Sequence, residues 1–447
     1  HRIARRQRQM CIRDSSYTGA DVSNYSITNH ANVTANITAR SLSVSGVTAS
    51  DKTYDGSVTA TMNSSSAVYS GFVSGDDFAA SYSGVFSDKN VGSGKTVTIT
   101  SSYAGADVSN YNITDQTSTT ANITAKALTA TASASNKVYD GSSAATVTLS
   151  LSGFIGSETV TSTNSSTFNN KNVGTGKTVT VNSITLANGS NGGLAANYSI
   201  STGQTTTANI TAKSLTVSGI TASNKTYNGN AVATLNTGSV AYSGLVDGDT
   251  FDGTYTGAFS DKNVGTGKTV TITPSYSGAD VSNYSITNHA NVTANITAKP
   301  LTVSGVTASD KTYDGSVTAT MNSSSAVYSG FVNGDDFAAS YSGVFADSNV
   351  GSGKTVTITS SYAGADVSNY NITDQTSTTA NISAKALTAT ASASNKVYDG
   401  SSAATSTLTL SGFVGSETVT STNSSTFNDK NVGTGKTVTV NSITLAN

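Results

Sequence analysis

The chain repeats itself at intervals of about 86 residues, and this period constrains the fold more than any other feature. Solenoid repeats usually run about 20 to 45 residues, too few for one repeat to bury its own core. A repeat of this length can close a small core of its own. The marker is Tyr-Asp-Gly or Tyr-Asn-Gly, with successive spacings of 85, 88, 86 and 85 residues, at Tyr54, Tyr139, Tyr227, Tyr313 and Tyr398.

Two further patterns place the repeat boundaries. Each repeat closes with Ala-Asn-Ile-Thr-Ala or Ala-Asn-Ile-Ser-Ala, and the next opens with an apolar stretch such as Leu-Thr-Val-Ser-Gly. Residues 16–188 match residues 275–447 with 12 differences in 173 positions, which indicates recent duplication of a three-repeat block. We expect the array to continue beyond both ends of the chain. The predicted units are a partial repeat at 16–40, repeats 1 to 4 at 41–126, 127–213, 214–299 and 300–385, and a truncated repeat 5 at 386–447.

The residues between the markers favour β-structure. Only 11% of the 447 residues are charged, Trp is absent, and Thr, Val and Tyr suit half-solvated pleated surfaces. Each repeat holds roughly seven short strand-like runs separated by turn residues. In one run, Val58, Ala60 and Met62 are predicted to face inward. We predict an all-β fold, a tandem array of about five small sandwich-like domains, with β-grasp-like units or a β-solenoid as alternatives.

The first fifteen residues differ from the rest in composition. They hold five of the six arginines and the only cysteine, Cys11. Homology to the later copy starts abruptly at Ser16, so we interpret 1–15 as foreign, adapter-derived sequence. Without it the chain has 24 − 5 = 19 basic and 26 − 1 = 25 acidic residues, a net charge of −6. That balance gives no support for a nucleic-acid partner, and no run of about 18 apolar residues predicts membrane insertion.

A Gly-x-Gly-Lys-Thr stretch in every repeat resembles a phosphate-binding loop, at 172–178 for example. A P-loop needs another glycine five residues before the second one, to make a loop that surrounds the phosphates. Lys89 and Lys171 stand there instead, before Gly94 and Gly176. The following Lys-Thr-Val-Thr-Ile-Thr alternates as a strand does. We therefore predict a hairpin turn with a positive-φ glycine, and no nucleotide site.

The acidic residue of the marker is the first candidate for chemistry. Asp55 and its copies suggest acid–base catalysis or metal binding, but repeat 3 carries Asn228 at this position. Asn cannot act as a general base, whereas both residues suit the left-handed position of a tight turn before glycine. We predict a turn. Tyr54 and its copies are expected to cap the core at strand ends, with a ligand-facing surface as the alternative.

Calcium is the cofactor alternative that the acidic residues leave open. Asp76, Asp77 and Asp88 supply oxygen atoms of the kind that calcium prefers. In repeat 2 the counterparts retain one acid, Glu158, and Asn170 replaces Asp88. No known calcium-loop spacing is present, so no residue is assigned to a metal and no cofactor is predicted.

Residues for nucleophilic catalysis are scarce. Beyond residue 15 the only histidines are His30 and its copy His289, and no Gly-x-Ser-x-Gly elbow occurs. We predict no enzymatic activity and no catalytic residue. Asn-x-Ser/Thr triplets, such as those at Asn36 and Asn122, are expected by chance in a chain so rich in these residues.

The combination of Lys-Thr-Tyr-Asp-Gly or Lys-Val-Tyr-Asp-Gly with Asn-Val-Gly-x-Gly-Lys-Thr and Ala-Asn-Ile-Thr-Ala resembles the YDG-type repeats of large bacterial surface proteins. Those proteins include filamentous-haemagglutinin-like exoproteins and adhesins. The resemblance covers residues 16–447 and implies an all-β array, secreted and displayed at the cell surface, with no catalytic residues. The expected function is a structural stalk whose partners are neighbouring repeats. The alternative is a multivalent array that binds host glycans or matrix proteins.

Overall fold

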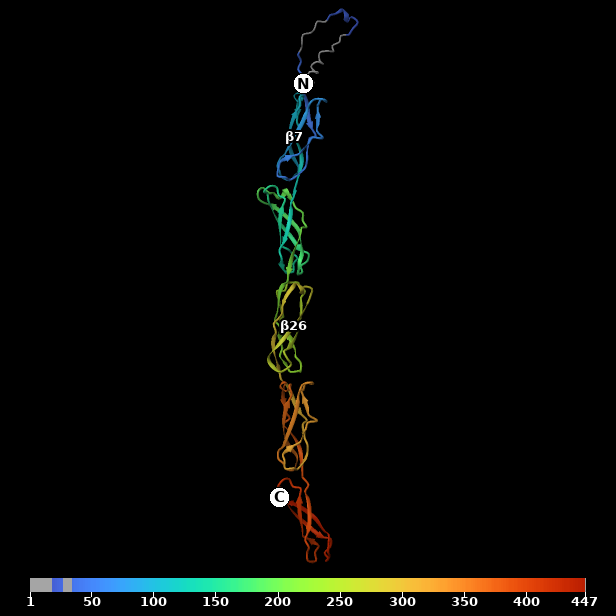
Figure 1. Cartoon of the computed structure of the whole chain (residues 1–447), viewed down its shortest axis with the longest axis vertical. Helices are drawn as coiled ribbons and strands as arrows, with labels where there is room; N and C mark the ends of the chain where they lie inside the picture. The colour runs from blue at the N-terminus through green and yellow to red at the C-terminus, as the bar shows by residue number, and fades with distance from the viewer. Residues whose placement is uncertain (1–17, 27–33, 447) are drawn as a thin grey trace. The chain divides into compact units, whose positions relative to one another are not determined.

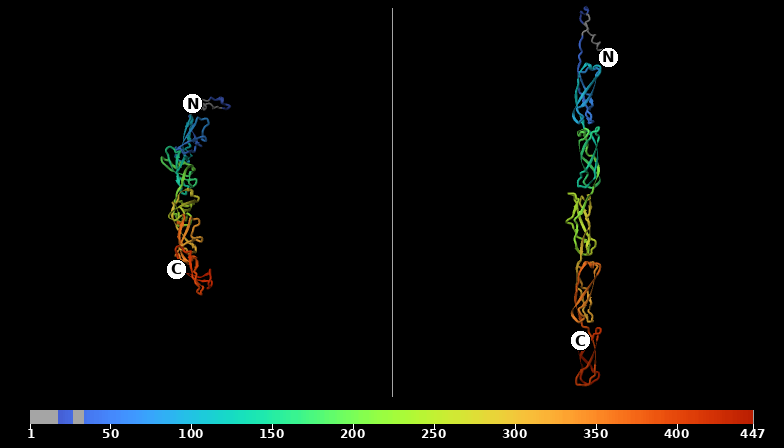
Figure 2. Two further views of the ribbon diagram at one scale, coloured as in Figure 1. Left: turned by 60° about the horizontal axis from the view of Figure 1, so that its bottom comes forward. Right: turned by 90° about the vertical axis from the view of Figure 1, so that its left-hand side faces the viewer.

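The computed structural model describes residues 18–26 and 34–446. The predicted foreign segment 1–15 and His30 lie outside them. The described residues form β-strands and single 3₁₀ turns, with no α-helix among them, so the predicted all-β fold is confirmed. None of their helical turns has the length or the apolar character needed to cross a membrane. The strands gather into successive groups along the chain, with β7 in repeat 1 and β26 in repeat 3 (Figure 1), and two other views show the same grouping (Figure 2).

Repeats 1, 3 and 4 have matching elements. After a 3₁₀ turn, η1 (Val22–Asn24), repeat 1 comprises β1 (Arg40–Ser45), β2 (Thr48–Ala49), β3 (Lys52–Thr53), β4 (Thr59–Ala60), β5 (Met62–Asn63), β6 (Val68–Ser70), β7 (Ala79–Phe86), β8 (Gly92–Ala104), η2 (Val108–Asn110), β9 (Tyr111–Thr114) and β10 (Ser118–Thr124). Repeat 3 comprises β19 (Lys213–Ser218), β20 (Thr221–Ala222), β21 (Lys225–Thr226), β22 (Val232–Ala233), β23 (Leu235–Asn236), β24 (Ala241–Ser243), β25 (Asp252–Phe259), β26 (Gly265–Ser277), η4 (Val281–Asn283), β27 (Tyr284–Thr287) and β28 (Val292–Thr297). Repeat 4 comprises β29 (Lys299–Ser304), β30 (Thr307–Ala308), β31 (Lys311–Thr312), β32 (Thr318–Ala319), β33 (Met321–Asn322), β34 (Val327–Ser329), β35 (Ala338–Phe345), β36 (Gly351–Ala363), η5 (Val367–Asn369), β37 (Tyr370–Thr373) and β38 (Ser377–Ser383).

Repeats 2 and 5 have fewer and longer strands. Repeat 2 comprises β11 (Lys126–Ala127), β12 (Thr129–Ala134), β13 (Lys137–Val138), β14 (Val147–Ser152), β15 (Val160–Phe168), β16 (Gly174–Asn188), η3 (Ala195–Asn197), β17 (Tyr198–Ser199) and β18 (Thr205–Thr211). Repeat 5 comprises β39 (Thr388–Ala393), β40 (Ala403–Ala404), β41 (Ser406–Ser411), β42 (Thr420–Phe427) and β43 (Val438–Ala446).

Each complete repeat pairs its strands in two main sheets. In repeat 1 a five-stranded sheet has the order β3-β10-β8-β7-β4, and a three-stranded sheet has the order β6-β1-β9. β7, β8 and β10 pair antiparallel, whereas β3 lies parallel to β10 and β1 parallel to β9. Repeats 3 and 4 reproduce both orders with their own strands. This common topology brings the marker, which follows β3, to the edge where β10 ends.

The core of each repeat lies between these sheets. In repeat 1 it includes Phe86, Val97 and Ile123, all at most 2% exposed. Val97 illustrates the predicted alternation along β8, where buried apolar residues alternate with exposed threonines. The predicted inward position of Val58 is wrong, since its side chain is 39% exposed. β4 begins one residue later, so Val58 does not share the pleat that turns Ala60 inward.

The glycine-rich stretch is a β-bulge inside a strand, and the predicted hairpin turn at this position is wrong. The β7–β8 hairpin turns earlier, at residues 87–91, and Gly94 lies within β8. Gly94 has the predicted positive φ, 59°. Against β10, Lys95 pairs with Ala121 and Gly92 with Ile123, so β8 carries one extra residue. A left-handed glycine suits either a turn or a bulge, and the ladder decides which forms.

Consecutive repeats follow each other with almost no linker. β10 ends at Thr124 and β11 begins at Lys126. The chain divides into two compact units, the first formed by residues up to 135, 144–169 and 177–208, the second by 136–143, 170–176 and 209 onward. The first unit contains the contact region between repeats 1 and 2, and the second contains those between repeats 2 and 3, 3 and 4, and 4 and 5. We call these regions joints 1–2, 2–3, 3–4 and 4–5.

Candidate functional site: the joints between repeats

The acidic residue of the marker shapes a local turn. In repeat 1 the Asp55 carboxylate accepts hydrogen bonds from the Ser57 backbone N–H (2.9 Å) and from Lys52 Nζ (2.7 Å). In repeat 3 the amide oxygen of Asn228 also accepts a hydrogen bond from a lysine, Lys225 (2.9 Å). The predicted turn is confirmed. The left-handed residue is Gly56, with φ 78°, and not Asp55 as predicted.

The tyrosine of the marker binds the next repeat. Tyr54 is 1% exposed, and its hydroxyl donates to Glu158 Oε1 of repeat 2 at 2.8 Å. Tyr198, also from repeat 2, donates to the same carboxylate at 2.7 Å, and its ring packs edge-on against Tyr54 at 5.6 Å. Lys89 Nζ lies 2.9 Å from Glu158 Oε1. Joint 1–2 therefore encloses one carboxylate between two phenols and an ammonium group.

Joint 2–3 repeats this arrangement with a second carboxylate. Tyr139 donates to Asp249 Oδ2 at 2.8 Å, and Tyr284 donates to the same oxygen at 2.5 Å. Lys171 Nζ lies 2.9 Å from Asp249 Oδ1 and 3.0 Å from Asp280 Oδ1. One lysine from repeat 2 thus bridges two acids of repeat 3.

Joint 3–4 has the same geometry. Tyr227 donates to Asp335 Oδ1 at 2.8 Å, and Tyr370 donates to Asp335 Oδ2 at 2.5 Å. Lys262 Nζ lies 3.2 Å from Asp335 and 2.9 Å from Asp366. The Asp335 side chain is only 3% exposed, so these three donors replace the water that it loses.

An asparagine clamp accompanies each of these three networks. In joint 1–2 the Val91 backbone N–H donates to Asn197 Oδ1 at 2.9 Å, and Asn197 Nδ2 donates to Asn90 Oδ1 at 3.0 Å. The side-chain amide therefore pairs with both a backbone donor and a side-chain acceptor of the preceding repeat. The backbone bond recurs at 2.9 Å from Val173 to Asn283 and from Val264 to Asn369.

The glycine of the marker allows close approach of the next repeat. A Cβ added to Gly56 would lie 2.8 Å from Ile155 Cγ2, and one on Gly229 would lie 2.7 Å from Val332 Cγ1. Both glycines also have a positive φ that other residues adopt only with strain. Glycine is thus required here both by backbone conformation and by packing between repeats.

The joints hold their acids ionised. Burial alone would raise the pKa of Glu158, but hydrogen bonds from Tyr198, Lys89 and Tyr54 outweigh it and lower the pKa. Asp249 behaves in the same way, because Tyr284, Lys171 and Tyr139 offset its burial and lower its pKa. Every neighbour of these carboxylates donates to them. The site is suited to fixing one repeat on the next rather than to proton transfer.

The residues considered for calcium bind protein groups at separate places. Asp76 accepts a hydrogen bond from Tyr111, Asp77 from the Ala106 backbone N–H, and Asp88 from Lys95. Across residues 18–26 and 34–446, no three His, Cys, Asp or Glu side chains are grouped so that they could hold a metal ion.

His289, a copy of the His30 that lies outside the described residues, is exposed, and its Nδ1 lies 2.6 Å from the Ala290 carbonyl oxygen. No nucleophile is paired with it in any hydrogen bond that the described residues form.

Sequence reasoning missed the lysine and the acid of each joint. Lys89, Lys171 and Lys262 occupy equivalent positions, as do Glu158, Asp249 and Asp335. The signal was present in the alignment of the repeats: an acid persists at this position while its neighbours change.

Comparison with known families agrees with this repeat structure. Five stretches match the YDG domain, at residues 38–120, 124–208, 211–293, 297–379 and 383–447, and together they cover most of the chain. The chain belongs to the YDG domain family. In its YDG domains, the Tyr and the Gly of the marker contact the following domain, and the Asp shapes the turn that presents them. No curated protein matches the chain.

Proposed function

We propose that this array of YDG domains is a structural spacer: the stalk, or repetitive body, of a large secreted bacterial cell-surface adhesin. The observation that carries the proposal is the use made of the marker. Tyr54, Tyr139 and Tyr227 are each 1% exposed and donate their hydroxyls to the following domain. The family's signature side chain is thereby engaged in holding domains together, which is the property that a spacer requires.

The surface chemistry supports the same role. Low charge and abundant Ser and Thr keep a long array soluble without strong attraction between arrays. The secreted, cell-surface and adhesin parts of the proposal rest on the resemblance to filamentous-haemagglutinin-like proteins. In this role the domains need no cofactor and no catalytic residue.

Binding of host glycans or matrix proteins is the competing function. Such arrays usually present aromatic side chains for stacking against sugars. Here Tyr69, Phe78 and Tyr111 pack on one another, with ring centroids 5.7 Å and 6.0 Å apart, and each is buried or half-buried. Their mutual packing favours a core role over a ligand-binding face.

Deletion of one domain tests the spacer role. The longest strand of repeat 3, β26, has 13 residues, which corresponds to about 44 Å of extended chain. Removing residues 214–299 should shorten the maximum dimension in small-angle scattering by about that length. An unchanged dimension would contradict the proposal. Glycan or matrix binding whose avidity rises with the number of domains would favour the competing function.

A further inference from the structure

Repeat 5 presents an open groove where the complete repeats hold a strand. In repeat 4, β38 pairs with β31 and β36, and it covers Phe345 and Val356, which are 2% and 0% exposed. In repeat 5 the sheet order is β40-β42-β43, so β43 is an edge strand. The equivalent residues Phe427 and Val438 are half-buried.

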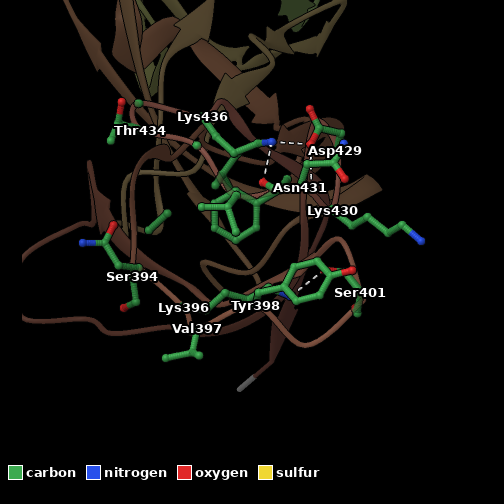
Figure 3. Close-up of a pocket in the computed structure, with 17 residues that line it drawn as sticks. Ser394, Lys396, Val397, Tyr398, Ser401, Asp429, Lys430, Asn431, Thr434 and Lys436 are labelled. Carbon is green, nitrogen blue, oxygen red and sulfur yellow. Dashed lines mark hydrogen bonds and ion pairs between the residues drawn. The ribbon is translucent and has the colours of Figure 1, made fainter.

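The groove has a volume of about 670 Å³, and Figure 3 shows its side chains. It is lined by the counterparts of the residues that contact β38, among them Lys396, Phe427, Lys436 and Val438. Lys436 donates to the Asn431 carbonyl oxygen at 2.8 Å and also binds Asp429. The lining is therefore already in the arrangement of a complete repeat, with the apolar floor uncovered.

A segment near the start of the chain has the sequence of the strand that would fill this groove. Residues 34–39 read Thr-Ala-Asn-Ile-Thr-Ala, identical to residues 293–298. In β28, Ala294 and Ile296 are 5% and 2% exposed, whereas Ile37 is fully exposed at the equivalent position of residues 34–39. An apolar strand-forming segment without a strand partner favours addition to an exposed sheet edge.

The two end domains also carry complementary halves of a joint. Repeat 5 exposes Tyr398 and Val432, at 56% and 88%, and Lys430 extends away from the groove in Figure 3. These are the counterparts of Tyr54, Val91 and Lys89 in joint 1–2.

Repeat 1 carries the opposite half. Tyr111 donates to Asp76 at 2.5 Å, and the Val73 backbone N–H donates to the Tyr111 hydroxyl at 3.0 Å. The corresponding bonds in repeat 3, from Tyr284 to Asp249 and from Val246 to Tyr284, measure 2.5 Å and 2.9 Å. The acceptor side of a joint is thus preformed in repeat 1.

The two features are in register with each other. In repeat 3, β28 ends at Thr297 and β29 begins at Lys299, so the last strand of one domain leads directly into the next domain. Residues 34–39 precede β1 at the same spacing. A copy whose segment fills the groove therefore brings its own repeat 1 to the exposed end of repeat 5.

We propose that copies of this chain associate head to tail, with residues 34–39 of one copy added to β43 of a second copy. Tyr398 and Lys430 of the second copy then bind Asp76, and the Val432 backbone N–H donates to Asn110. The surfaces in contact differ, so the association is heterologous and extends to further copies without closing. The inference does not depend on the spacer function.

Sedimentation velocity of the full chain over a range of micromolar concentrations tests the proposal. Oligomers of two and more copies should grow with concentration. Ile37→Asp removes the apolar contact of the segment, and Val432→Asp blocks the exposed end. Each should weaken self-association at least about tenfold. Both side chains are exposed, so neither change disturbs the folded domain. Val327→Asp, at a 55% exposed position outside the groove and the joints, should associate as the parent chain does.

Mixing the two variants makes the test directional. The Ile37→Asp copy retains an intact groove, and the Val432→Asp copy retains an intact segment, so their mixture should form 1:1 pairs and no longer species. A parent chain that stays monomeric would overturn the proposal. So would a monomer in which Ile37 is shielded, since that indicates closure within one copy, or variants that assemble as the parent chain does.

Discussion

Joints 3–4 and 4–5 begin from the same tyrosine but bury it to different extents. Tyr227 is 1% exposed, whereas Tyr313 is partly exposed and donates to Glu417. The lysine that bridges two acids in joint 3–4, Lys262, is replaced by Ser348 in repeat 4. The described residues of repeat 5 also include no counterpart of Tyr370. Burial of the marker tyrosine thus requires the cation and the second ring as well as the acceptor.

Joints 1–2 and 2–3 show which part of the network is dispensable. Repeat 2 has Leu194 where repeat 3 has Asp280, so Lys89 pairs with one carboxylate and Lys171 with two. Tyr54 and Tyr139 are nevertheless both 1% exposed. The second acid is therefore an addition to a joint that already closes without it.

Removing the central acid should have the largest effect. Asp335→Ala leaves Lys262 and the hydroxyls of Tyr227 and Tyr370 without their buried acceptor. We expect a loss of about 3–5 kcal/mol from the coupling of repeats 3 and 4. The measurement is equilibrium unfolding of the full chain in urea, in which these two repeats should unfold at lower denaturant.

The matched change in joint 4–5 is Glu417→Ala. Only the half-exposed Tyr313 loses its acceptor there, so the cost should be at most about 1 kcal/mol. Equal costs for the two substitutions would show that the additional partners of Asp335 contribute nothing.

Closing the space beside the marker glycine should have the next largest effect. Gly229→Ala places a methyl group 2.7 Å from Val332 Cγ1 at a φ of 81°. We expect a loss of about 2–3 kcal/mol in thermal unfolding, of which about 1 kcal/mol is backbone strain. Gly267→Ala is the control, because its φ is 59° and a Cβ there has no neighbour within 4 Å. If both variants lose the same amount, contact with Val332 is unimportant.

Acid should loosen the joints that hold ionised carboxylates. Backbone and lysine hydrogen bonds lower the pKa of Asp280 below its usual 3.8, and the pKa of Asp249 is lowered despite its burial. A lowered folded-state pKa contributes stability that is present above the unfolded value and lost as the pH falls through the folded value. The melting temperature should therefore hold from neutral pH to about pH 4 and fall below it.

Asp249→Asn separates joint 2–3 from the exposed Lys–Asp pairs, such as Lys95 with Asp88, that also titrate. This variant should start from a lower melting temperature and lose less of it in acid. A pH profile identical to that of the parent chain would exclude joint 2–3 as the source.

The smallest effect is expected at the acid of the marker. Asp55→Asn should change the free energy of unfolding by less than about 0.5 kcal/mol, because Asn228 already accepts the equivalent lysine hydrogen bond in repeat 3. Differential scanning calorimetry of the full chain measures it. Loss of a bound ion from the variant would restore the metal interpretation of this residue.

The sequence determined the domain fold better than the joints. The period and the alternation of residues such as Val97 with threonine predict compact β domains, because both follow from local burial. The left-handed glycine at residue 94 was also predictable, whereas its place in a bulge depends on pairing with β10. The partner of Tyr54 is 104 residues away in the chain. No local pattern specifies such a contact, and the change from Glu158 to Asp249 conceals it further.

The central claim is that each complete joint couples adjacent YDG domains through a buried network. Native-state hydrogen exchange at four equivalent backbone amides tests it most directly. Val91, Val173 and Val264 donate to an asparagine of the next domain, whereas Val350 is 55% exposed and forms no such bond in the described structure. We predict slow exchange at the first three amides and fast exchange at Val350. Equally fast exchange at all four would contradict the account, since the domains would then be independent.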